Sequence, residues 1–383
     1  MRNSSNNAVA EVERPVEERF DDHLGLQDID YIEFYVGNAK QAAYFYQNVF
    51  GFELVGYSGL ETGNRNSISY LIQQGNIRFV LTSPLNSNSP IAQHVMKHGD
   101  GVKDLTMLVS DVDRAYEETL KRGAKGVLEP CNLKDEKGTI RKAAIAAYGE
   151  TIHTFINRDN YSGTFLPGFV SMKSPIKDIE PVGIQFVDHV VGNVELGKMN
   201  EWVNFYKDVM GFTQYISFDD KDISTEYSAL MSKVMAGGRG YIKFPINEPA
   251  AGKKKSQIDE YLEYYEGPGV QHIALLTGDI IKTVTLLQEK GLEFLHAPAS
   301  YYEELGNRVG HIDEPIKDIA KLGILVDRDD EGYLLQIFSK PVVDRPTLFY
   351  EIIQRKGARG FGKGNFKALF EAIEKEQEKR GNL

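Results

Sequence analysis

The segment "VDHVVGNVELGKMNEWVNFYKDVMGF" (187–212) has an internal echo in "IEFYVGNAKQAAYFYQNVFGF" (32–52). Each copy predicts a strand, a Val-Gly-Asn turn, an amphipathic helix and a closing Gly-Phe. When the two turns are aligned, Phe34 stands where the later copy has His189. Because self-similarity at a fixed offset marks duplicated units, the two copies indicate a chain built from homologous parts.

Two further repeats extend the duplication along the chain. "HGDGVKDLTMLVSDV" (98–112) aligns with "EGPGVQHIALLTGDI" (266–280) and pairs Asp104 with His272. "YGETIHTFINRDNYSGTFLPG" (148–168) aligns more loosely with "EGYLLQIFSKPVVDRPTLFYE" (331–351) and pairs Gly168 with Glu351. We therefore expect a polar, flexible leader (1–25), two homologous domains (26–170 and 180–355), and a C-terminal loop and helix (356–383).

The local pattern within each half predicts a mixed α+β architecture. "SDVDRAYEETLKRGA" (110–124) and "GDIIKTVTLLQEKGL" (278–292) carry Asp or Ser at the start and glycine at the end, which is typical of capped helices. "TEYSALMSKVMAGGRGYIKFPI" (225–246) predicts two strands across a Gly-Gly turn. These signals indicate four strand-helix-strand-strand-strand (βαβββ) units, two in each domain.

Composition narrows the class of protein. The chain has 383 residues and a formal net charge of −11, which argues against nucleic acid or an anionic membrane as partner. No apolar run approaches the ~20 residues of a membrane helix, and the leader lacks the apolar segment of a signal peptide. The single cysteine, Cys131, excludes an intrachain disulfide and suits a reducing cytosol. We expect a cytoplasmic protein that acts on a small molecule.

The two halves differ at three positions in one chemical direction. His189, His272 and Glu351 stand where the first half has Phe34, Asp104 and Gly168. Two imidazoles and one carboxylate form the facial ligand set of non-haem Fe(II) oxygenases, which leaves positions open for substrate and O2. Glu351 also lies on an apolar strand face, where an unpaired carboxylate is costly. Arg345 or Arg355 could pair with it instead of a metal.

The other histidines and the C-terminal helix carry weaker signals. His153 is predicted to be structural, and five more histidines in polar or loop context are predicted to be surface or hydrogen-bonded residues: His23, His94, His98, His296 and His311. On the C-terminal segment, an apolar stripe at helical spacing comprises Phe366, Leu369, Phe370 and Ile373. This helix either packs on the surface, where it could form an oligomer contact, or forms a lid hinged at the preceding glycines.

Six motifs together resemble the 4-hydroxyphenylpyruvate dioxygenase family. They are "FVDHVVGNV" (186–194), "PINEPAAGKKKSQIDEYL" (245–262), "GPGVQHIAL" (267–275), "LGILVDRDDEGYLLQIFSKP" (322–341), "RPTLFYEIIQR" (345–355) and "GFGKGNFKALFE" (360–371). The resemblance spans roughly residues 26–375. It implies the vicinal-oxygen-chelate fold with a C-terminal lid helix.

The resemblance also implies a reaction and a ligand set. One Fe(2+) per subunit would bind His189, His272 and Glu351, and 4-hydroxyphenylpyruvate, a small aromatic 2-oxo acid, would react with O2 to give homogentisate and CO2 in tyrosine breakdown. The family's substrate pocket falls on Ser232, Asn247, Gln257, Gln271, Gln336, Phe338, Phe349, Asn365 and Phe366. Gln336 and Phe338 share a strand face, whereas strict alternation would turn Gln271 away from His272. Tyr350 should face away from the iron. A homo-oligomer, dimer or tetramer, is expected.

Two alternatives share this fold. A 4-hydroxymandelate synthase would use the same ligands and substrate but oxidise the benzylic carbon, and Pro245 and Asn247 favour the dioxygenase over it. A catalytically silent protein of the same fold would bind a ligand without turnover.

Overall fold

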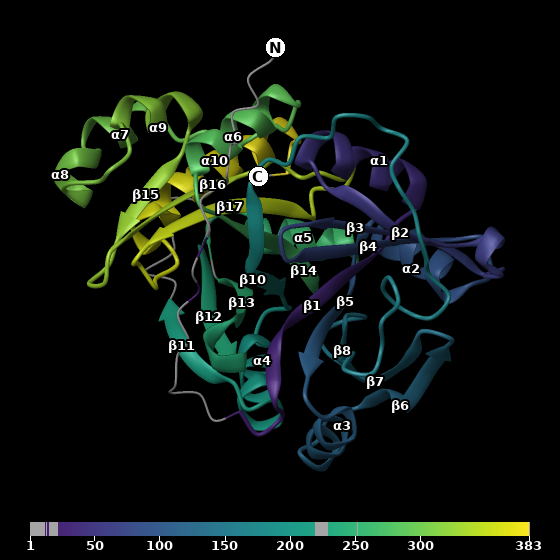
Figure 1. The fold of residues 1–383 in the computed structure, drawn as a ribbon. Coiled ribbons are helices and arrows are strands. Elements are labelled where there is room, and N and C mark those ends of the chain that lie inside the picture. The colour runs from purple at the N-terminus through teal and green to yellow at the C-terminus, as the bar shows by residue number, and fades with distance from the viewer. Residues whose placement is uncertain (1–11, 13, 15–21, 219–228, 251, 383) are drawn as a thin grey trace.

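The computed structural model describes residues 12, 14, 22–218, 229–250 and 252–382. The predicted leader therefore lies largely outside the described residues. Within them, the strands form one nine-stranded and one eight-stranded sheet, each mixing parallel and antiparallel pairs (Figure 1).

The first sheet has the strand order β6-β7-β8-β5-β1-β4-β3-β2-β9. Its strands are β1 (Leu26–Tyr35), β2 (Glu53–Ser58), β3 (Ser67–Gln74), β4 (Ile77–Pro84), β5 (Gly101–Val109), β6 (Gly126–Asp135), β7 (Gly138–Ala146), β8 (Ile152–Asn157) and β9 (Val170–Ser171). The second sheet has the order β11-β12-β13-β10-β14-β17-β16-β15. Its strands are β10 (Ile184–Asn193), β11 (Thr213–Phe218), β12 (Ala229–Gly237), β13 (Ile242–Ala250), β14 (Gly269–Thr277), β15 (Leu325–Arg328), β16 (Tyr333–Phe338) and β17 (Phe349–Lys356).

The helices are α1 (Ala39–Phe50), α2 (Pro90–His98), α3 (Val112–Lys121), α4 (Met199–Asn204), α5 (Gln257–Tyr265), α6 (Ile280–Glu289), α7 (Ala299–Glu303), α8 (Leu305–Val309), α9 (Ile316–Leu322) and α10 (Phe366–Lys379). Their ends follow from local sequence: the side chains of Asp111 and Asp279 cap α3 and α6 as predicted. Helix α1 begins after Asn38, whose side chain accepts from the Gln41 N–H, and ends at Gly51 in the left-handed region (φ 71°). None of the helices in the described part of the chain is long and apolar enough to cross a membrane.

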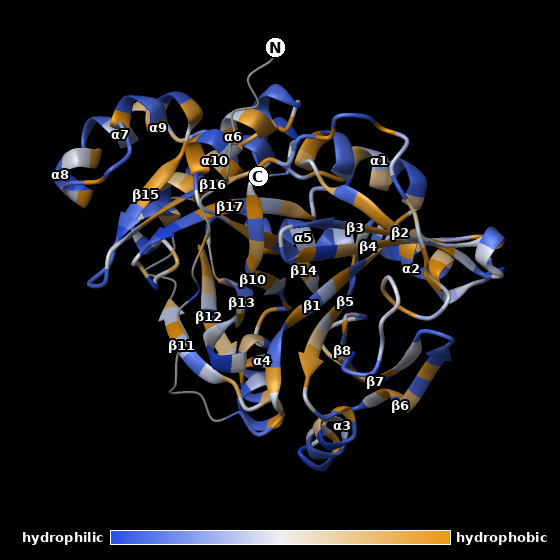
Figure 2. Cartoon of the chain, in the orientation of Figure 1, coloured by the Kyte–Doolittle hydropathy of each residue, from blue (hydrophilic) through white to orange (hydrophobic). Residues whose placement is uncertain are grey.

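The two sheets are built alike. Read from β15 to β11, the second sheet repeats the first from β6 to β2, so β1 corresponds to β10, β5 to β14 and β8 to β17. The prediction of homologous βαβββ units is confirmed by this correspondence. Figure 2 shows hydrophobic residues running through the strands of both sheets, and one hydrophobic core is continuous across them.

The register of β1 corrects the alignment of His189. Tyr31 pairs with Thr106 across β1 and β5, and His189 pairs with Ala274 at the equivalent place across β10 and β14. The counterpart of His189 is therefore Tyr31, and the expectation of Phe34 was wrong. The two Val-Gly-Asn motifs misled the comparison because 191–193 lie inside β10, whereas 36–38 follow the end of β1.

The third repeat was also aligned wrongly. Asp104 lies beside Ile152 in the β5–β8 pair, and His272 lies beside Phe349 in the β14–β17 pair, which confirms Asp104 as the counterpart of His272. Counting along the equivalent strands makes Thr154, not Gly168, the counterpart of Glu351. The sequence comparison had matched β8 to β16, one strand too early, because both strands are largely apolar and Phe155 of β8 then coincides with Phe338 of β16.

Several buried hydrogen bonds join the two halves. The Tyr350 hydroxyl lies 2.8 Å from the Tyr46 hydroxyl of α1, so Tyr350 points into the first domain and away from His189, as predicted. His153 is fully buried, and its Nε2 lies 2.8 Å from the Tyr206 hydroxyl of the second domain. The face of the second sheet that carries Tyr350 therefore lies against the first domain, and Glu351, the next residue of β17, faces the opposite way.

Candidate metal centre and substrate cavity

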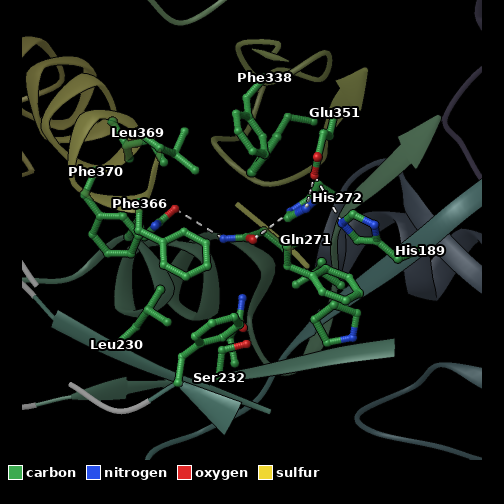
Figure 3. A pocket seen from close by; sticks show the side chains of 18 of the residues that line it. His189, Leu230, Ser232, Gln271, His272, Phe338, Glu351, Phe366, Leu369 and Phe370 are labelled. Atoms are coloured by element: carbon green, nitrogen blue, oxygen red, sulfur yellow. Dashed lines mark hydrogen bonds and ion pairs between the residues drawn. The ribbon is translucent and has the colours of Figure 1, made fainter. Parts of the chain in front are cut away.

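Three neighbouring strands bring His189, His272 and Glu351 together. The register places Ala274 of β14 beside both His189 of β10 and Glu351 of β17, and its small side chain leaves room between them. Oε2 of Glu351 lies 3.1 Å from Nε2 of His189 and 3.4 Å from Nε2 of His272 (Figure 3). One ligand atom from each residue falls within 4.8 Å of the others, so a single ion can touch all three.

A polar side chain supports the far nitrogen of each histidine. Nδ1 of His189 lies 2.8 Å from Oδ2 of Asp188, and Nδ1 of His272 lies 3.0 Å from Oε1 of Gln271. Carboxylate and amide oxygens accept hydrogen bonds, so each Nδ1 donates and each Nε2 keeps its lone pair for a metal. This is the arrangement that metal-binding histidines need.

Both supporting residues are extra residues of β-bulges. The β10–β14 register steps from Val187/Leu275 to His189/Ala274, leaving Asp188 unpaired, and from Val191/His272 to Gly192/Val270, leaving Gln271 unpaired. A bulge re-aims the side chain that strict alternation would send to the other face. Gln271 therefore lies beside His272, and the expectation that it turns away was wrong.

The charges of the centre favour a bound cation. Burial would raise the pKa of Glu351, but the two histidines outweigh it and hold that pKa below its usual value. Burial would lower the pKa of His189, yet the carboxylates of Glu351 and Asp188 raise it. Burial does lower the pKa of His272, which keeps that imidazole neutral. An ionised carboxylate among imidazoles at this depth is a suitable donor set for a divalent transition metal.

The arginines that could have paired with Glu351 have other partners. Arg345 donates to backbone carbonyls, including that of Tyr264 at 2.8 Å, and the Arg355 guanidinium pairs with Asp188. Neither arginine makes an ion pair with Glu351 in the described structure. The carboxylate is left to the two histidines and to whatever ion they hold.

A second group of His, His and Glu lies in the first domain. His94 and His98 of α2 approach Glu150 and are buried; both are hydrogen-bonded, in agreement with the prediction of surface or hydrogen-bonded residues. Lys97 Nζ lies 3.0 Å from Oε1 of Glu150, and Lys103 donates to the Glu150 carbonyl. Because two ammonium groups already supply positive charge there, we assign the metal centre to the first group.

A cavity with mainly apolar walls and a few polar groups opens from the metal centre, as is typical of small-molecule sites. Seven of the predicted substrate residues line it: Ser232, Asn247, Gln257, Gln271, Phe338, Phe349 and Phe366. The apolar stripe of α10 covers one side, where Phe366, Leu369 and Phe370 point inward (Figure 3). Arg380, just past the end of α10, forms a bidentate pair with the buried Glu260 of α5 at 2.7 and 2.9 Å.

Two predicted substrate residues lie outside the lining of this cavity. Gln336 shares a strand face with Phe338. Phe338 pairs with Glu351, whereas Gln336 pairs with Ile353, two residues further along β17, and lies against Gly362. Asn365 is fully buried, and its Oδ1 accepts a hydrogen bond from the Tyr301 hydroxyl at 2.6 Å. Phe361 is a lining residue that the sequence reading missed; its ring lies 5.0 Å from that of His189. Its place in "GFGKGN", close after the Glu351 strand, was the available signal.

Curated relatives match nearly the whole chain. A protein named 4-hydroxyphenylpyruvate dioxygenase from Yarrowia lipolytica is 48% identical over 92% of this chain and 93% of its own length. Another of that name from Dictyostelium discoideum is 50% identical over 94% of this chain and 100% of its own. The chain belongs to the 4-hydroxyphenylpyruvate dioxygenase family. A third relative of that name, from Danio rerio, is 50% identical over 92% of this chain and 91% of its own length.

Domain models and a solved structure agree with membership of the 4-hydroxyphenylpyruvate dioxygenase family. Residues 20–166 match the hydroxyphenylpyruvate dioxygenase N-terminal model, and residues 187–337 match the glyoxalase/bleomycin resistance protein/dioxygenase superfamily. A mutant 4-hydroxymandelate synthase from Streptomyces coelicolor superposes with a TM-score of 0.83 at 32% identity, covering 92% of this chain and 100% of its own. The fold is thus the expected α+β vicinal-oxygen-chelate fold.

Proposed function

We propose that the protein is an Fe(II)-dependent dioxygenase that converts 4-hydroxyphenylpyruvate and O2 to homogentisate and CO2. The observation that carries this proposal is the buried group of His189, His272 and Glu351 at one end of a cavity lined by aromatic rings and amides. The curated relatives at 48–50% identity carry the name of this activity, whereas the 4-hydroxymandelate synthase is 32% identical. The dioxygenase is the better supported of the two reactions.

Fe(2+) held by these three residues would bind the 2-oxo acid group of the substrate and activate O2, which is the chemistry open to this ligand set. The chain's own contribution at this point is the fixed direction of the Nε2 atoms, which Asp188 and Gln271 set through Nδ1. The substrate supplies the 2-oxo acid itself, so no second oxo acid is needed.

The aromatic rings of the cavity would hold the substrate ring near the metal. Phe349 stacks on His272 with ring centroids 4.8 Å apart, and Phe338 packs edge-on against His272 at 5.9 Å. Phe366 faces them from α10. An aromatic ring bound among these side chains stays close to the ligand histidines, and its own quadrupole favours offset or edge-on contact with them.

The polar residues of the cavity would orient the two ends of the substrate. Ser232, Asn247 and Gln257 supply a hydroxyl and two amides at the cavity wall. Gln271 joins the two regions, because its Oε1 accepts from His272 and its Nε2 lies 3.4 Å from Oε1 of Gln257. A phenol bound near Gln257 would thus be tied by hydrogen bonds to the metal centre. The roles of Gln336 and Asn365 in substrate binding stay predictions, because neither residue lines the cavity and each would have to act through a lining residue.

Helix α10 would exclude water during turnover. Its apolar stripe faces the cavity, and the Arg380–Glu260 pair fixes its far end to α5. Water in the cavity would divert the reaction from the substrate ring, so a closed apolar wall would protect the chemistry. A cytosolic homo-oligomer remains our expectation for its working state.

The test is to load the protein with Fe(II) under anaerobic conditions, add 4-hydroxyphenylpyruvate and ¹⁸O₂, and identify the product by mass spectrometry. We expect homogentisate with one labelled atom in the carboxylate and one in the new ring hydroxyl, apart from exchange with water. Recovery of 4-hydroxymandelate as main product would replace the dioxygenase with the synthase. Iron and substrate binding without oxygen uptake would indicate a silent ligand-binding protein.

A further inference from the structure

The ligand His189 is connected to an arginine far along the chain. Oδ2 of Asp188 lies 2.8 Å from Nδ1 of His189, and the same carboxylate accepts from Nε and Nη2 of Arg355 at 2.7 and 2.8 Å. The Asp188 side chain is 3% exposed and that of Arg355 is 16% exposed. A bidentate pair at this depth fixes the carboxylate in position and direction.

Arg355 also holds the segment that leads into α10. Its Nη1 donates to the Gly360 carbonyl at 2.7 Å and to the Ala358 carbonyl at 3.2 Å. Its guanidinium carbon lies 5.4 Å from the centre of the Phe361 ring, which in turn packs against His189. The backbone of 358–361 thus reaches His189 by two routes, through Asp188 and through Phe361.

The first domain contains the same pair without a histidine. Nε and Nη2 of Arg158 donate to Oδ2 of Asp30 at 2.8 and 2.6 Å, and Arg158 also donates to the Phe165 carbonyl and lies 4.8 Å from its ring. By strand register, Asp30 is the bulge residue that corresponds to Asp188, and Arg158 corresponds to Arg355. The residue after Asp30 is Tyr31.

This comparison separates two roles of the pair. Because both domains have it, the aspartate–arginine pair belongs to the shared scaffold and ties the strand end to the chain that follows. Only in the second domain does the aspartate also contact a proposed metal ligand. There the pair can affect the metal as well as the fold.

We propose that Asp188 and Arg355 are positioning residues that couple the seating of the C-terminal segment to the orientation and donor strength of His189. This inference rests on the proposed metal centre. The hydrogen bond from Nδ1 of His189 to the charged carboxylate of Asp188 is stronger than the hydrogen bond from Nδ1 of His272 to the neutral amide oxygen of Gln271. When Arg355 releases 358–361, Asp188 loses its fixed direction, and His189 loses its support with it.

The experiment compares the pair with its copy in the first domain. Asp188→Asn and Arg355→Gln are set against the matched controls Asp30→Asn and Arg158→Gln. The readouts are anaerobic Fe(II) affinity, the electron paramagnetic resonance spectrum of the ferrous–nitric oxide complex, the melting temperature, and proteolysis of the chain after Gly360. None of these needs turnover.

All four variants should lower the melting temperature, because each breaks a buried ion pair, although Asp30 keeps Arg78 as a partner in Arg158→Gln. Only Asp188→Asn and Arg355→Gln should weaken Fe(II) binding, by about 10- to 100-fold, and alter the nitric oxide spectrum. Arg355→Gln should also speed cleavage after Gly360. Arg355→Lys should restore part of the affinity, since it returns the charge without the planar fork.

Equal Fe(II) affinity and equal spectra in the two sets of variants would overturn the proposal and leave the pair purely structural. If one variant of the second domain does not fold, the other and Arg355→Lys still decide. If the wild-type protein binds Fe(II) but makes no homogentisate, the proposed function fails while this comparison still stands.

Discussion

Oε2 of Glu351 lies 3.1 Å from Nε2 of His189, with both side chains only 4% exposed. With the imidazoles neutral, Glu351 and Asp188 contribute two negative charges and Arg355 one positive charge, so the centre carries a net charge of −1. A divalent ion brings the net charge to +1, and the carboxylate of a bound 2-oxo acid brings it to zero. The charge balance of the buried centre thus suits a metal first and an anionic substrate second.

Replacing Glu351 with glutamine should remove iron binding. Gln keeps the volume but not the charge, and an amide is a poor ligand for ferrous iron among two neutral imidazoles. We expect Fe(II) affinity to fall by at least about 100-fold, with oxygen uptake lost, as measured by anaerobic iron titration and an oxygen electrode. Glu150→Gln is the control, because it removes the carboxylate of the other His-His-Glu group and should leave both readouts unchanged. Iron loss in Glu150→Gln instead would move the centre to the first domain.

Removing residues 363–383 should leave iron bound but uncouple O2 consumption from product formation. The cut keeps the three proposed ligands, Phe361 and the carbonyls that Arg355 binds, and removes Phe366 and the rest of α10. Water then enters the cavity, so the ratio of homogentisate formed to O2 consumed should fall well below one. Arg380→Gln removes only the bidentate contact of Arg380 with Glu260, which Asn382 still contacts, and should lower the ratio less. A truncated protein with the wild-type ratio would show that α10 serves packing alone.

Gly362→Ala tests whether Gln336 matters for turnover. Gly362 has φ of +77°, and a Cβ there would lie 2.5 Å from Oε1 of the buried Gln336. Gly381 has φ of +69° with nothing within 4 Å of its Cβ, so Gly381→Ala carries the same backbone strain, about 1 kcal/mol, without the clash. We expect kcat/KM to fall at least about tenfold in Gly362→Ala and to stay near wild type in Gly381→Ala. Equal activity in both variants would assign Gln336 a purely structural place.

Much of the site could be predicted from the sequence because its chemistry stands out against a repeated scaffold. His272 was compared with its structural counterpart, Asp104, since their strands match without insertions. His189 and Glu351 were selected because their side chains can bind a metal, but they were compared with the wrong residues of the first domain. A shared motif such as Val-Gly-Asn shows that two short sequences are alike, but it does not show that they occupy equivalent positions in the sheet. Strand register is set by bulges and loop lengths, which sequence similarity does not reveal.

The same bulges explain what the sequence could not reveal about Gln271 and Asp188. In a regular strand, the residue next to a proposed ligand histidine points to the opposite face of the sheet. The bulges in β10 and β14 change the direction of Asp188 and Gln271, so that each side chain lies beside its histidine. The Asp188–Arg355 pair was likewise hidden, because 167 residues separate its members. Contacts of that kind depend on how strands are ordered in the sheet.

His153 should make the stability of the protein depend on pH below neutrality. It is fully buried between the domains, with its ring stacked on Phe244 and its Nε2 bonded to the Tyr206 hydroxyl. Burial lowers its pKa from 6.5 to about 4. Between pH 6.5 and about 4, His153 of the unfolded chain binds a proton that His153 of the folded protein does not. The contribution of this group to the free energy of unfolding is therefore fully present above pH 6.5 and falls as the pH drops toward 4. The loss from this group is roughly 3 kcal/mol.

His153→Gln separates this effect from the titration of carboxylates. Glutamine can still accept a hydrogen bond from the Tyr206 hydroxyl but does not titrate. The variant therefore loses the ring contact with Phe244 at every pH. Protonation at this position no longer lowers its stability. Melting temperatures of both proteins measured from pH 7 to pH 4 should therefore converge as the pH falls, with the variant less stable at pH 7. Parallel curves would mean that His153 is already protonated in the folded protein at neutral pH or reaches solvent freely. Either result would contradict a neutral imidazole sealed between the two domains.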